Sequence, residues 1–198
     1  MQNQKFSLLQ YRFTGYLPNK QAIMLLTVNL RSFKRVVRYN RRRMRLFLTS
    51  LEKKPPRGLD RMILEADKSI WGKTDCLHCA NCCKTMSPTY SKEDVRRISK
   101  HLGMTQKSFR KKWLFKEKDG DWLNKSQPCQ FLDAKTNMCS IYDVRPRDCA
   151  GFPHHTKKKM IDYMHVYKQN IEYCPATYRV VELLNERLNG STEKLIGS

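Results

Sequence analysis

The stretch CLHCANCC, from Cys76 to Cys83, places four cysteines within eight residues and decides how the rest of the chain is interpreted. Its cysteines follow the pattern C-x2-C-x2-C-C. A gap of two residues lets consecutive thiolates turn inward onto one ion, because the backbone between them forms a tight turn. Disulfide bonds, a bound metal and reactive thiols are the three chemical explanations for such a cluster.

The sequence shows no segment suited to crossing a membrane. A spanning helix needs about 20 apolar residues, and no run approaches that length. The run AIMLLTVNL, Ala22–Leu30, is too short, and basic residues follow it instead of a signal-peptide cleavage site. We therefore predict a cytoplasmic protein. Structural disulfides are rare in that reducing compartment, so clustered cysteines favour metal binding.

Four more cysteines lie downstream of the cluster. Cys129, Cys139 and Cys149 are separated by nine residues each, and Cys174 is followed directly by Pro175. Such a dense set in one intracellular chain is typical of metal ligands. The predicted ligands are Cys76, Cys79, Cys82, Cys83, Cys129, Cys139, Cys149 and Cys174.

The sequence leaves the metal open between zinc and an iron–sulfur cluster. Zinc accepts four thiolates in tetrahedral geometry. C-x2-C-x2-C with a distant Cys-Pro resembles the cluster-binding run of bacterial ferredoxins, although Met86 stands where the fourth cysteine would fall. Eight cysteines suit either two four-thiolate sites or one cluster with cysteines to spare. Arg145 is predicted to lie beside the ligands and to compensate their negative charge.

The chain is strongly basic, with 39 Lys and Arg against 18 Asp and Glu and a formal net charge of +21. No acidic residue precedes Glu52, and the stretch RSFKRVVRYNRRRMR, Arg31–Arg45, holds eight basic residues. This balance favours an anionic partner. The basic N-terminal helix could contact nucleic acid, an acidic protein or an anionic membrane surface, and the sequence does not choose among them.

Apolar periodicity predicts a basic helix over residues 31–51, ended by Pro55 and Pro56, and a second helix over 59–71. Ser91 and Gly103 bracket a capped helix, and further helices follow near the C-terminus. The segment from Cys129 to Tyr142 predicts a small hairpin. The fold class is thus mainly α with a small β-hairpin, and irregular cysteine-rich loops organised around metal.

We expect residues 1–30 to be a poorly ordered extension, because they lack periodicity. Met24 stands just before the patterned region, so whether 1–23 belong to the native protein is open. Residues 31–190 are predicted to form a single domain and 191–198 a tail. Within the domain, 31–70 would be a basic helical part, 71–178 the cysteine-cluster part, and 179–190 the C-terminal end of the last helix.

Four motifs together resemble a known family: DCLHCANCCK, PCQFLD, CSIYDVRPRDCAGFPH and YCP. They are similar to the YkgJ-like cysteine-cluster family, also described as a zinc- or iron-chelating domain, over about residues 70–180. The resemblance implies metal or iron–sulfur binding. A flagellin lysine N-methylase contains a domain of this kind, so the resemblance also implies an enzymatic alternative. The family commonly has Arg directly after the cysteine of its RPxxC segment, where this chain has Ala150.

The remaining candidate site residues are histidines. His78 lies inside the cluster, while His154 and His155 are interpreted as surface residues. No glycine-rich cofactor loop, Ser-His-Asp order or paired-carboxylate pattern supports catalysis. The leading hypothesis is a metal-binding cysteine-cluster protein that holds zinc or an iron–sulfur cluster. The alternatives are an iron–sulfur-dependent redox or protein-modifying, methylase-like enzyme, and a nucleic-acid-binding module with a metal scaffold.

Overall fold

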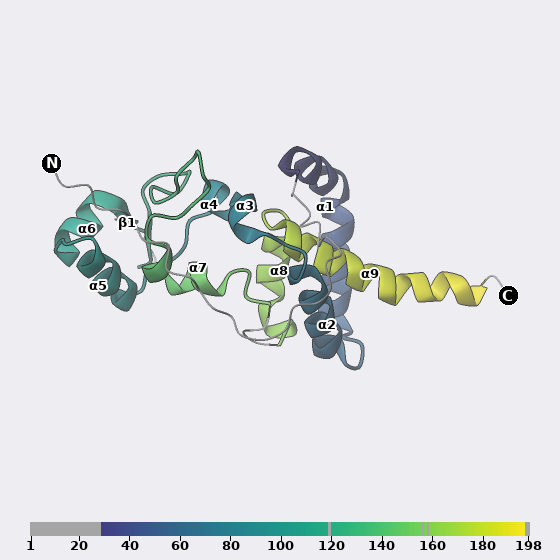
Figure 1. Ribbon diagram of the computed structural model, residues 1–198. Helices are drawn as coiled ribbons and strands as arrows, with labels where there is room; N and C mark the ends of the chain where they lie inside the picture. The colour runs from purple at the N-terminus through teal and green to yellow at the C-terminus, as the bar shows by residue number, and fades with distance from the viewer. Residues whose placement is uncertain (1–28, 119, 156, 158, 197–198) are drawn as a thin grey trace, which may run out of the picture.

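The computed structural model describes residues 29–196, except for residues 119, 156 and 158 and the side chains beyond residue 190. The predicted N-terminal extension and the question of residues 1–23 therefore lie outside the described residues, apart from residues 29 and 30. The elements, in order, are α1 (Leu30–Lys53), α2 (Leu59–Trp71), α3 (Cys76–Cys79), α4 (Asn81–Thr85), α5 (Lys92–His101), α6 (Gln106–Trp113), β1 (Leu114–Lys116), β2 (Trp122–Asn124), η1 (Tyr142–Val144), α7 (Arg147–Gly151), η2 (Ile161–Tyr163), α8 (Met164–Asn170) and α9 (Pro175–Ile196) (Figure 1).

Helix α1 follows from its sequence pattern. Asn29 caps its start by accepting a hydrogen bond from Ser32 N at 3.1 Å. Its end comes just before Pro55, which cannot donate a backbone hydrogen bond. The buried residues Phe33, Val37, Met44, Phe47, Leu48 and Leu51 share one face, and the arginines take the other. The predicted basic helix is confirmed.

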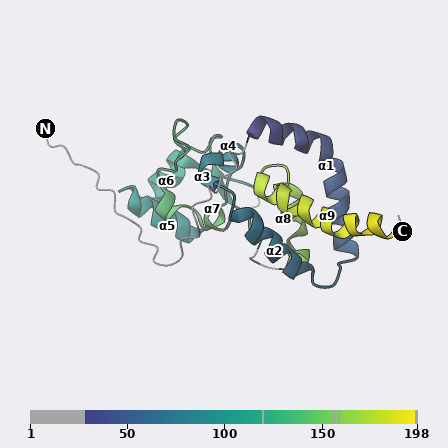
Figure 2. The same ribbon diagram turned by 45° about the vertical axis from the view of Figure 1, so that its right-hand side comes forward.

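We call α1, α2, α8 and α9 the helical lobe. Figures 1 and 2 both show α8 and α9 beside α1, with α2 along the other side of α9. These helices enclose one continuous apolar core, in which Met44, Leu48, Val181 and Leu184 are fully buried. Burial of such side chains stabilises by about 1.5–3 kcal/mol each, so this lobe has an ordinary hydrophobic source of stability.

We call residues 75–152, which include α3 to α7 and the hairpin, the cysteine lobe. It has a second, smaller core, made of Tyr90, Val95, Ile98, Phe109, Leu114, Phe131 and Ile141. Helix α5 starts with a reciprocal cap, because Ser91 Oγ accepts from Asp94 N and the Asp94 carboxylate accepts from Ser91 N. Gly103, at φ +64°, lets the chain turn out of this helix.

The two-stranded sheet is an antiparallel hairpin in which Leu114 pairs with Asn124. The fold class is confirmed: mainly helical, with a small β-hairpin. The hairpin lies in a different place from the one predicted, however. The segment after Cys129 forms only an isolated bridge between Leu132 and Cys139, because turns anchored on the Asp133 carboxylate occupy the residues between them.

Within the described ranges, none of the helices combines the length and the apolar character that crossing a membrane requires.

Candidate metal centre

The CLHCANCC stretch folds as two short helices with a sharp bend between them. Asp75 Oδ1 caps α3 by accepting from His78 N at 2.9 Å. Ala80 then adopts a left-handed conformation with φ +45°, which ends α3 and starts α4. The bend sets the four thiols at different depths: Cys76 is exposed, Cys79 is buried, and the other two are half-buried.

Cys174 is brought to this stretch from the end of α8. Asn81 Nδ2 donates to the carbonyl of Tyr173 at 2.6 Å, which fixes α4 against the residue before Cys174. Cys174 N donates to Asn170 O at 2.7 Å, and the buried Cys174 thiol accepts from Thr177 N at 3.5 Å. Two segments that are about ninety residues apart in sequence therefore meet at these thiols.

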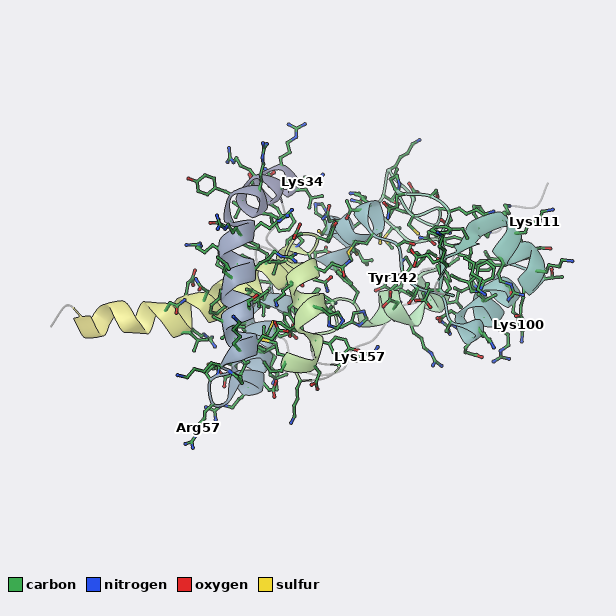
Figure 3. The ribbon with its side chains drawn as sticks, turned by 180° about the vertical axis from the view of Figure 1, so that it is seen from behind. Lys34, Arg57, Lys100, Lys111, Tyr142 and Lys157 are labelled. Atoms are coloured by element: carbon green, nitrogen blue, oxygen red, sulfur yellow. The ribbon has the colours of Figure 1, made fainter. Side chains whose placement is uncertain are left out.

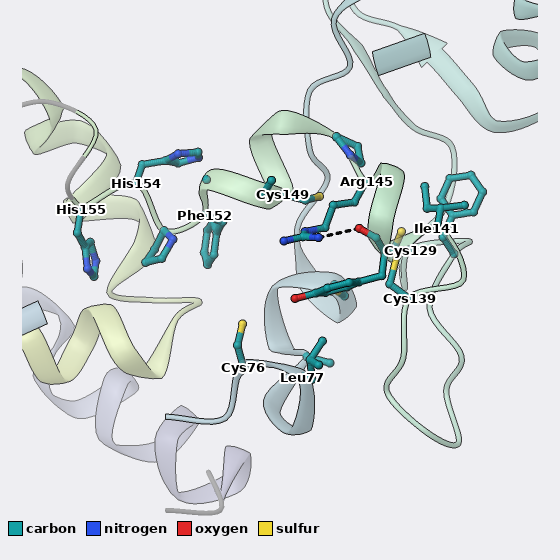
Figure 4. A pocket seen from close by; sticks show the side chains of 18 of the residues that line it. Cys76, Leu77, Cys129, Cys139, Ile141, Arg145, Cys149, Phe152, His154 and His155 are labelled. Atoms are coloured by element: carbon teal, nitrogen blue, oxygen red, sulfur yellow. Dashed lines mark hydrogen bonds between the residues drawn. The ribbon is translucent and has the colours of Figure 1, made fainter. Parts of the chain in front are cut away.

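Cys129, Cys139 and Cys149 approach the same stretch from the other side. Cys129 N donates to Cys83 O at 2.8 Å, which ties the second loop to α4. Leu132 N donates to Cys129 O at 2.9 Å. The backbone of Leu132 also forms the isolated β-bridge with Cys139. The short helix α7 carries Cys149. Five of the eight predicted ligands, Cys76, Cys83, Cys129, Cys139 and Cys149, line one cavity, and Figure 4 shows four of them around it.

Burial and mutual charge dominate the electrostatics of the thiols. Burial, together with the neighbouring thiols of Cys174, Cys79 and Cys83, raises the pKa of Cys76 to about 11. Burial also raises the pKa of Cys149, with added contributions from Cys83, Cys129 and other neighbours. Such a cluster is costly as free thiolates, and a cation among them would remove that cost.

Cys82 and Cys83 stand together, with their Sγ atoms 4.0 Å apart. A hydrogen bond between the two thiols raises the pKa of Cys82 and lowers that of Cys83 to about 7. Cys82 lies under the influence of Cys76 and Cys174. Cys83 acts on Cys129, Cys139 and Cys149 and also on Cys76 and Cys79.

The donor set fits a thiolate-bound metal, because eight free cysteines converge and none forms a disulfide. The side chains do not yet form a closed coordination shell. In the described part of the chain, no three His, Cys, Asp or Glu side chains are placed so that they could hold one ion. Zinc bonds of about 2.3 Å to sulfur would require the thiols to rotate closer together.

Arg145 lies beside the thiols, and no carboxylate among the described residues forms an ion pair with it. Its Nη1 donates to the carbonyl of Tyr142 at 2.7 Å, and its guanidinium carbon lies 3.9 Å from the centroid of the Tyr142 ring. The side chain is half-buried. Its charge lowers the pKa of Cys139, although burial of that thiol raises it by more.

The interpretation of His154 and His155 as surface residues is wrong. His155 is 5% exposed: its Nδ1 donates to Asp67 Oδ1 at 2.6 Å, its Nε2 faces the Thr177 hydroxyl at 2.9 Å, and its ring stacks on Tyr167. In the run Phe-Pro-His-His, Pro153 and His155 are buried, and Phe152 and His154 are half-buried. His78 stays exposed, and it contributes backbone hydrogen bonds to Asp75 and Asn137.

His154 forms a pair with an aspartate that the sequence argument missed. Its Nε2 donates to Asp148 Oδ1 at 3.0 Å, and this bond lowers the pKa of Asp148. Its Nδ1 is buried without a partner in the described residues. The ring packs over Gly151, where an added Cβ would lie 3.0 Å from Nδ1. Asp148 directly precedes the predicted ligand Cys149, and this position in the sequence could have marked it as a residue of the site.

A cavity of about 370 Å³ opens beside the cysteines. In Figure 4 the Cys76 thiol and the Arg145 guanidinium point into it, and Phe152 lies along its wall. The sequence did not predict this cavity, because its lining comes from α2, α3, α4, η1, α7, Tyr90, the loop between Cys129 and Ile141, and the loop after α7.

Comparison with known proteins finds a matching family and, over part of the chain, a curated relative. The model of the family described as "CxxCxxCC: Putative zinc- or iron-chelating domain" matches residues 75–175. The chain is 33% identical over 81 residues to "Uncharacterized protein MJ0661" of Methanocaldococcus jannaschii. That match covers 40% of this chain and 43% of the relative, so the chain spans less than half of the relative's length. No solved structure matches the chain.

Proposed function

The chain belongs to the CxxCxxCC family, and from this membership we propose that it holds zinc or an iron–sulfur cluster in two sites of four cysteines each. Metal binding is the general property that the family description supports. The observation that carries the finer proposal is the convergence of eight free thiols from separate segments into one region. Buried thiols without disulfides suit a thiolate-bound metal better than any other use of cysteine.

The first site would consist of Cys76, Cys79, Cys82 and Cys174. The hydrogen bond from Asn81 to Tyr173 fixes α4 beside the end of α8, so it places Cys174 near the other three. The charges of Cys76 and Cys174 on Cys82 support the same grouping.

The second site would consist of Cys83, Cys129, Cys139 and Cys149. The backbone bond from Cys129 to Cys83 and the bridge at Cys139 support this set. Cys83 influences all three of the other thiols. The adjacent Cys82 and Cys83 would thus belong to different sites, which would place the two metals on either side of α4.

A closed shell of four thiolates makes zinc a structural ion, whereas an iron–sulfur cluster supplies electron transfer. In either case the chain has to stabilise the negative charge of the thiolates. Backbone donors such as Thr177 N, and the nearby Lys84, would do so. The charge of Lys84 favours the thiolate forms of both Cys79 and Cys83, although burial of Cys79 raises its pKa by more.

Elemental analysis and a visible spectrum of anaerobically purified protein test the proposal. Zinc would leave the protein colourless, and an iron–sulfur cluster would colour it. Two double variants, Cys79→Ser with Cys174→Ser and Cys129→Ser with Cys139→Ser, serve as matched controls for each other. Each should lose about half of the bound metal. Loss of all metal from either one would indicate a single shared centre, and a metal-free wild-type protein would contradict the proposal.

A nucleic-acid-binding module is the second candidate, and the surface of α1 favours it. Arg31, Lys34, Arg35, Arg38 and Arg42 follow helical spacing along the face opposite the core. All five are exposed, and none has an ion pair within the described ranges. Figure 3 shows Lys34 pointing away from the body of the protein. A row of free cations is the feature that binds phosphate backbones.

The salt dependence of binding to a DNA duplex tests this candidate. Replacing Arg35, Arg38 and Arg42 with glutamine should reduce the slope of log affinity against log salt by about 0.9 for each lost phosphate contact. The matched control replaces Lys100, Lys111 and Lys157 with glutamine. These substitutions remove the same amount of charge elsewhere on the surface (Figure 3). An equal effect of both triple variants would show that only net charge matters and would reject α1 as the interface.

A further inference from the structure

The cavity beside the cysteines has the size and the lining of a small-molecule site. Its volume of about 370 Å³ falls within the range of about 300–1,000 Å³ that such sites occupy. Its walls include the apolar side chains of Leu77, Ile141 and Phe152, and one side of it is formed by five of the cysteines: Cys76, Cys83, Cys129, Cys139 and Cys149. Against this apolar lining, Arg145 is the cation that projects into the space (Figure 4).

Two contacts hold the Arg145 guanidinium in a fixed orientation. It lies flat on the Tyr142 ring at 3.9 Å, and its Nη1 donates to the Tyr142 carbonyl at 2.7 Å. The backbone is fixed as well, because the Arg145 carbonyl accepts from Arg97 Nη2 at 2.8 Å and Pro146 follows it. A pre-oriented side chain loses little entropy when it binds a ligand.

One edge of this guanidinium is free. Arginine has five N–H donors, and the bond to the Tyr142 carbonyl uses Nη1. The edge formed by Nε and Nη2 has no hydrogen-bond partner in the described part of the chain, and no carboxylate there pairs with Arg145. By contrast, Arg97 close by is paired with Asp94 at 2.7 Å. A half-buried, unpaired fork of this kind matches two oxygens of an anion.

We propose that the cavity binds a small organic anion, with its carboxylate or phosphate head on the free edge of Arg145 and its apolar body against Phe152 and Leu77. The two head groups share one chemistry, since each presents two oxygens to the fork. The inference goes beyond metal binding and does not depend on which metal the thiols hold. Ligand binding and metal content can therefore fail separately.

Titration calorimetry of the metal-loaded, full-length protein tests the proposal with three probes of similar shape: phenylacetate, phenyl phosphate and the uncharged phenylacetamide. We expect at least one anion to bind at about millimolar concentration or below, and at least tenfold more tightly than the amide. The tighter anion identifies the head group. If neither anion binds more tightly than the amide, the proposal is wrong.

Variants separate the site from the general positive charge. Arg145→Gln should weaken anion binding at least tenfold, and Arg145→Lys should weaken it less, because the charge stays while the fork is lost. The matched control is Arg147→Gln, which removes the same charge two residues away. Arg147 is exposed and does not line the cavity. Equal weakening in the control would overturn the proposal. Loss of bound metal in Arg145→Gln would also overturn it, since Arg145 would then compensate thiolate charge instead.

Discussion

The helical lobe and the cysteine lobe are built on different sources of order. Long helices in the first enclose a continuous apolar core around Leu48 and Leu184. The second has a smaller core around Phe109 and Phe131, where α5, α6 and the hairpin meet, and Cys129 and Cys139 pack against its edge (Figure 1). The loops that carry the cysteines are held by turns and single hydrogen bonds.

Buried polar groups connect the two lobes. His155 reaches from the loop after α7 to Asp67 on α2 and Thr177 on α9. Asn81 joins α4 to the end of α8. We therefore expect residues 31–190 to behave as one domain with two cores, in which the weaker part relies on metal. The predictions below test this difference between the lobes.

Removing the metal should have the largest effect on stability, and this effect should be confined to the cysteine lobe. Metal binding by four thiolates contributes about 10–16 kcal/mol in small zinc peptides, which equals the whole stability of many domains. Replacing Cys76 and Cys79 with serine should therefore expose the amides of the cysteine loops to hydrogen exchange. The helices α1, α2 and α9 should keep most of their protection, because their core does not include the thiols.

The measurement is hydrogen exchange followed by mass spectrometry on the double variant and on the wild type. Chelator-treated wild-type protein is the control, and it should reproduce the pattern of the variant. A metal-free variant with native protection across residues 75–175 would show that the loops are ordered without metal. Loss of protection in both lobes together would show that the two cores are not separable.

A core truncation in the helical lobe should give the reverse result. Leu48 is fully buried, and Leu48→Ala should lower the free energy of unfolding by about 2–5 kcal/mol through lost burial and the cavity left behind. Leu46→Ala is the matched control, because Leu46 lies on the same helix and is 60% exposed. Its effect should stay within about 0.5 kcal/mol. Denaturant unfolding measures both, and elemental analysis should find the metal content unchanged.

The sequence predicts the helical lobe better than the cysteine lobe, and the reason is physical. Apolar periodicity from Phe33 to Leu51 specifies a helix and the face that it buries. The capping signals of α5 act within a few residues, so Ser91 and Gly103 could be identified from sequence alone. The hairpin was misplaced because the polar turn after Asp133 forms its own side-chain bonds.

The candidate site could be predicted by residue type but not by arrangement. All eight cysteines were identified, because their density is visible in the sequence. Their grouping depends on long-range contacts such as that between Asn81 and Tyr173, which leave no local pattern. The burial of His155 depends in the same way on Asp67, from a helix far upstream. The cavity depends on the meeting of segments that lie far apart in the sequence, from Asp67 on α2 to His155.

A buried carboxylate in the cysteine lobe should give a smaller, pH-dependent effect. Burial would raise the pKa of Asp94, but hydrogen bonds from Ser91, Arg97 and Arg147 N outweigh it and hold the pKa below its ordinary value of 3.8. Asp94→Asn should therefore cost about 1.5–3 kcal/mol near pH 7, the value of a hydrogen bond to a charged group.

The sign of the pH dependence follows from the lowered pKa. The charged form of Asp94 stabilises the fold fully above its unfolded pKa, and this contribution is lost as the pH falls through the folded pKa. The difference between wild type and Asp94→Asn should thus shrink below about pH 4. Glu93→Gln is the control, because this exposed neighbour pairs only with Arg96 in the described structure. An equal loss from both variants at neutral pH would contradict the special role of Asp94.

The smallest effect should come from the ion pairs on the surface of the helical lobe. Glu172 accepts from Arg45 Nη1 at 2.9 Å and from Arg41 Nη1 at 3.3 Å, which links the end of α8 to α1. Both arginines are largely in solvent, so Glu172→Gln should cost only about 0.2–1 kcal/mol at low salt. At 1 M salt the Debye length falls to about 3 Å, and that difference should disappear. The cost of Leu48→Ala should persist under the same conditions, because burial of apolar surface does not depend on charge screening. If salt reduces both costs equally, or if Glu172→Gln costs as much as Leu48→Ala, then electrostatics would hold the helical lobe together, and the contrast between its core and the metal-dependent lobe would fail.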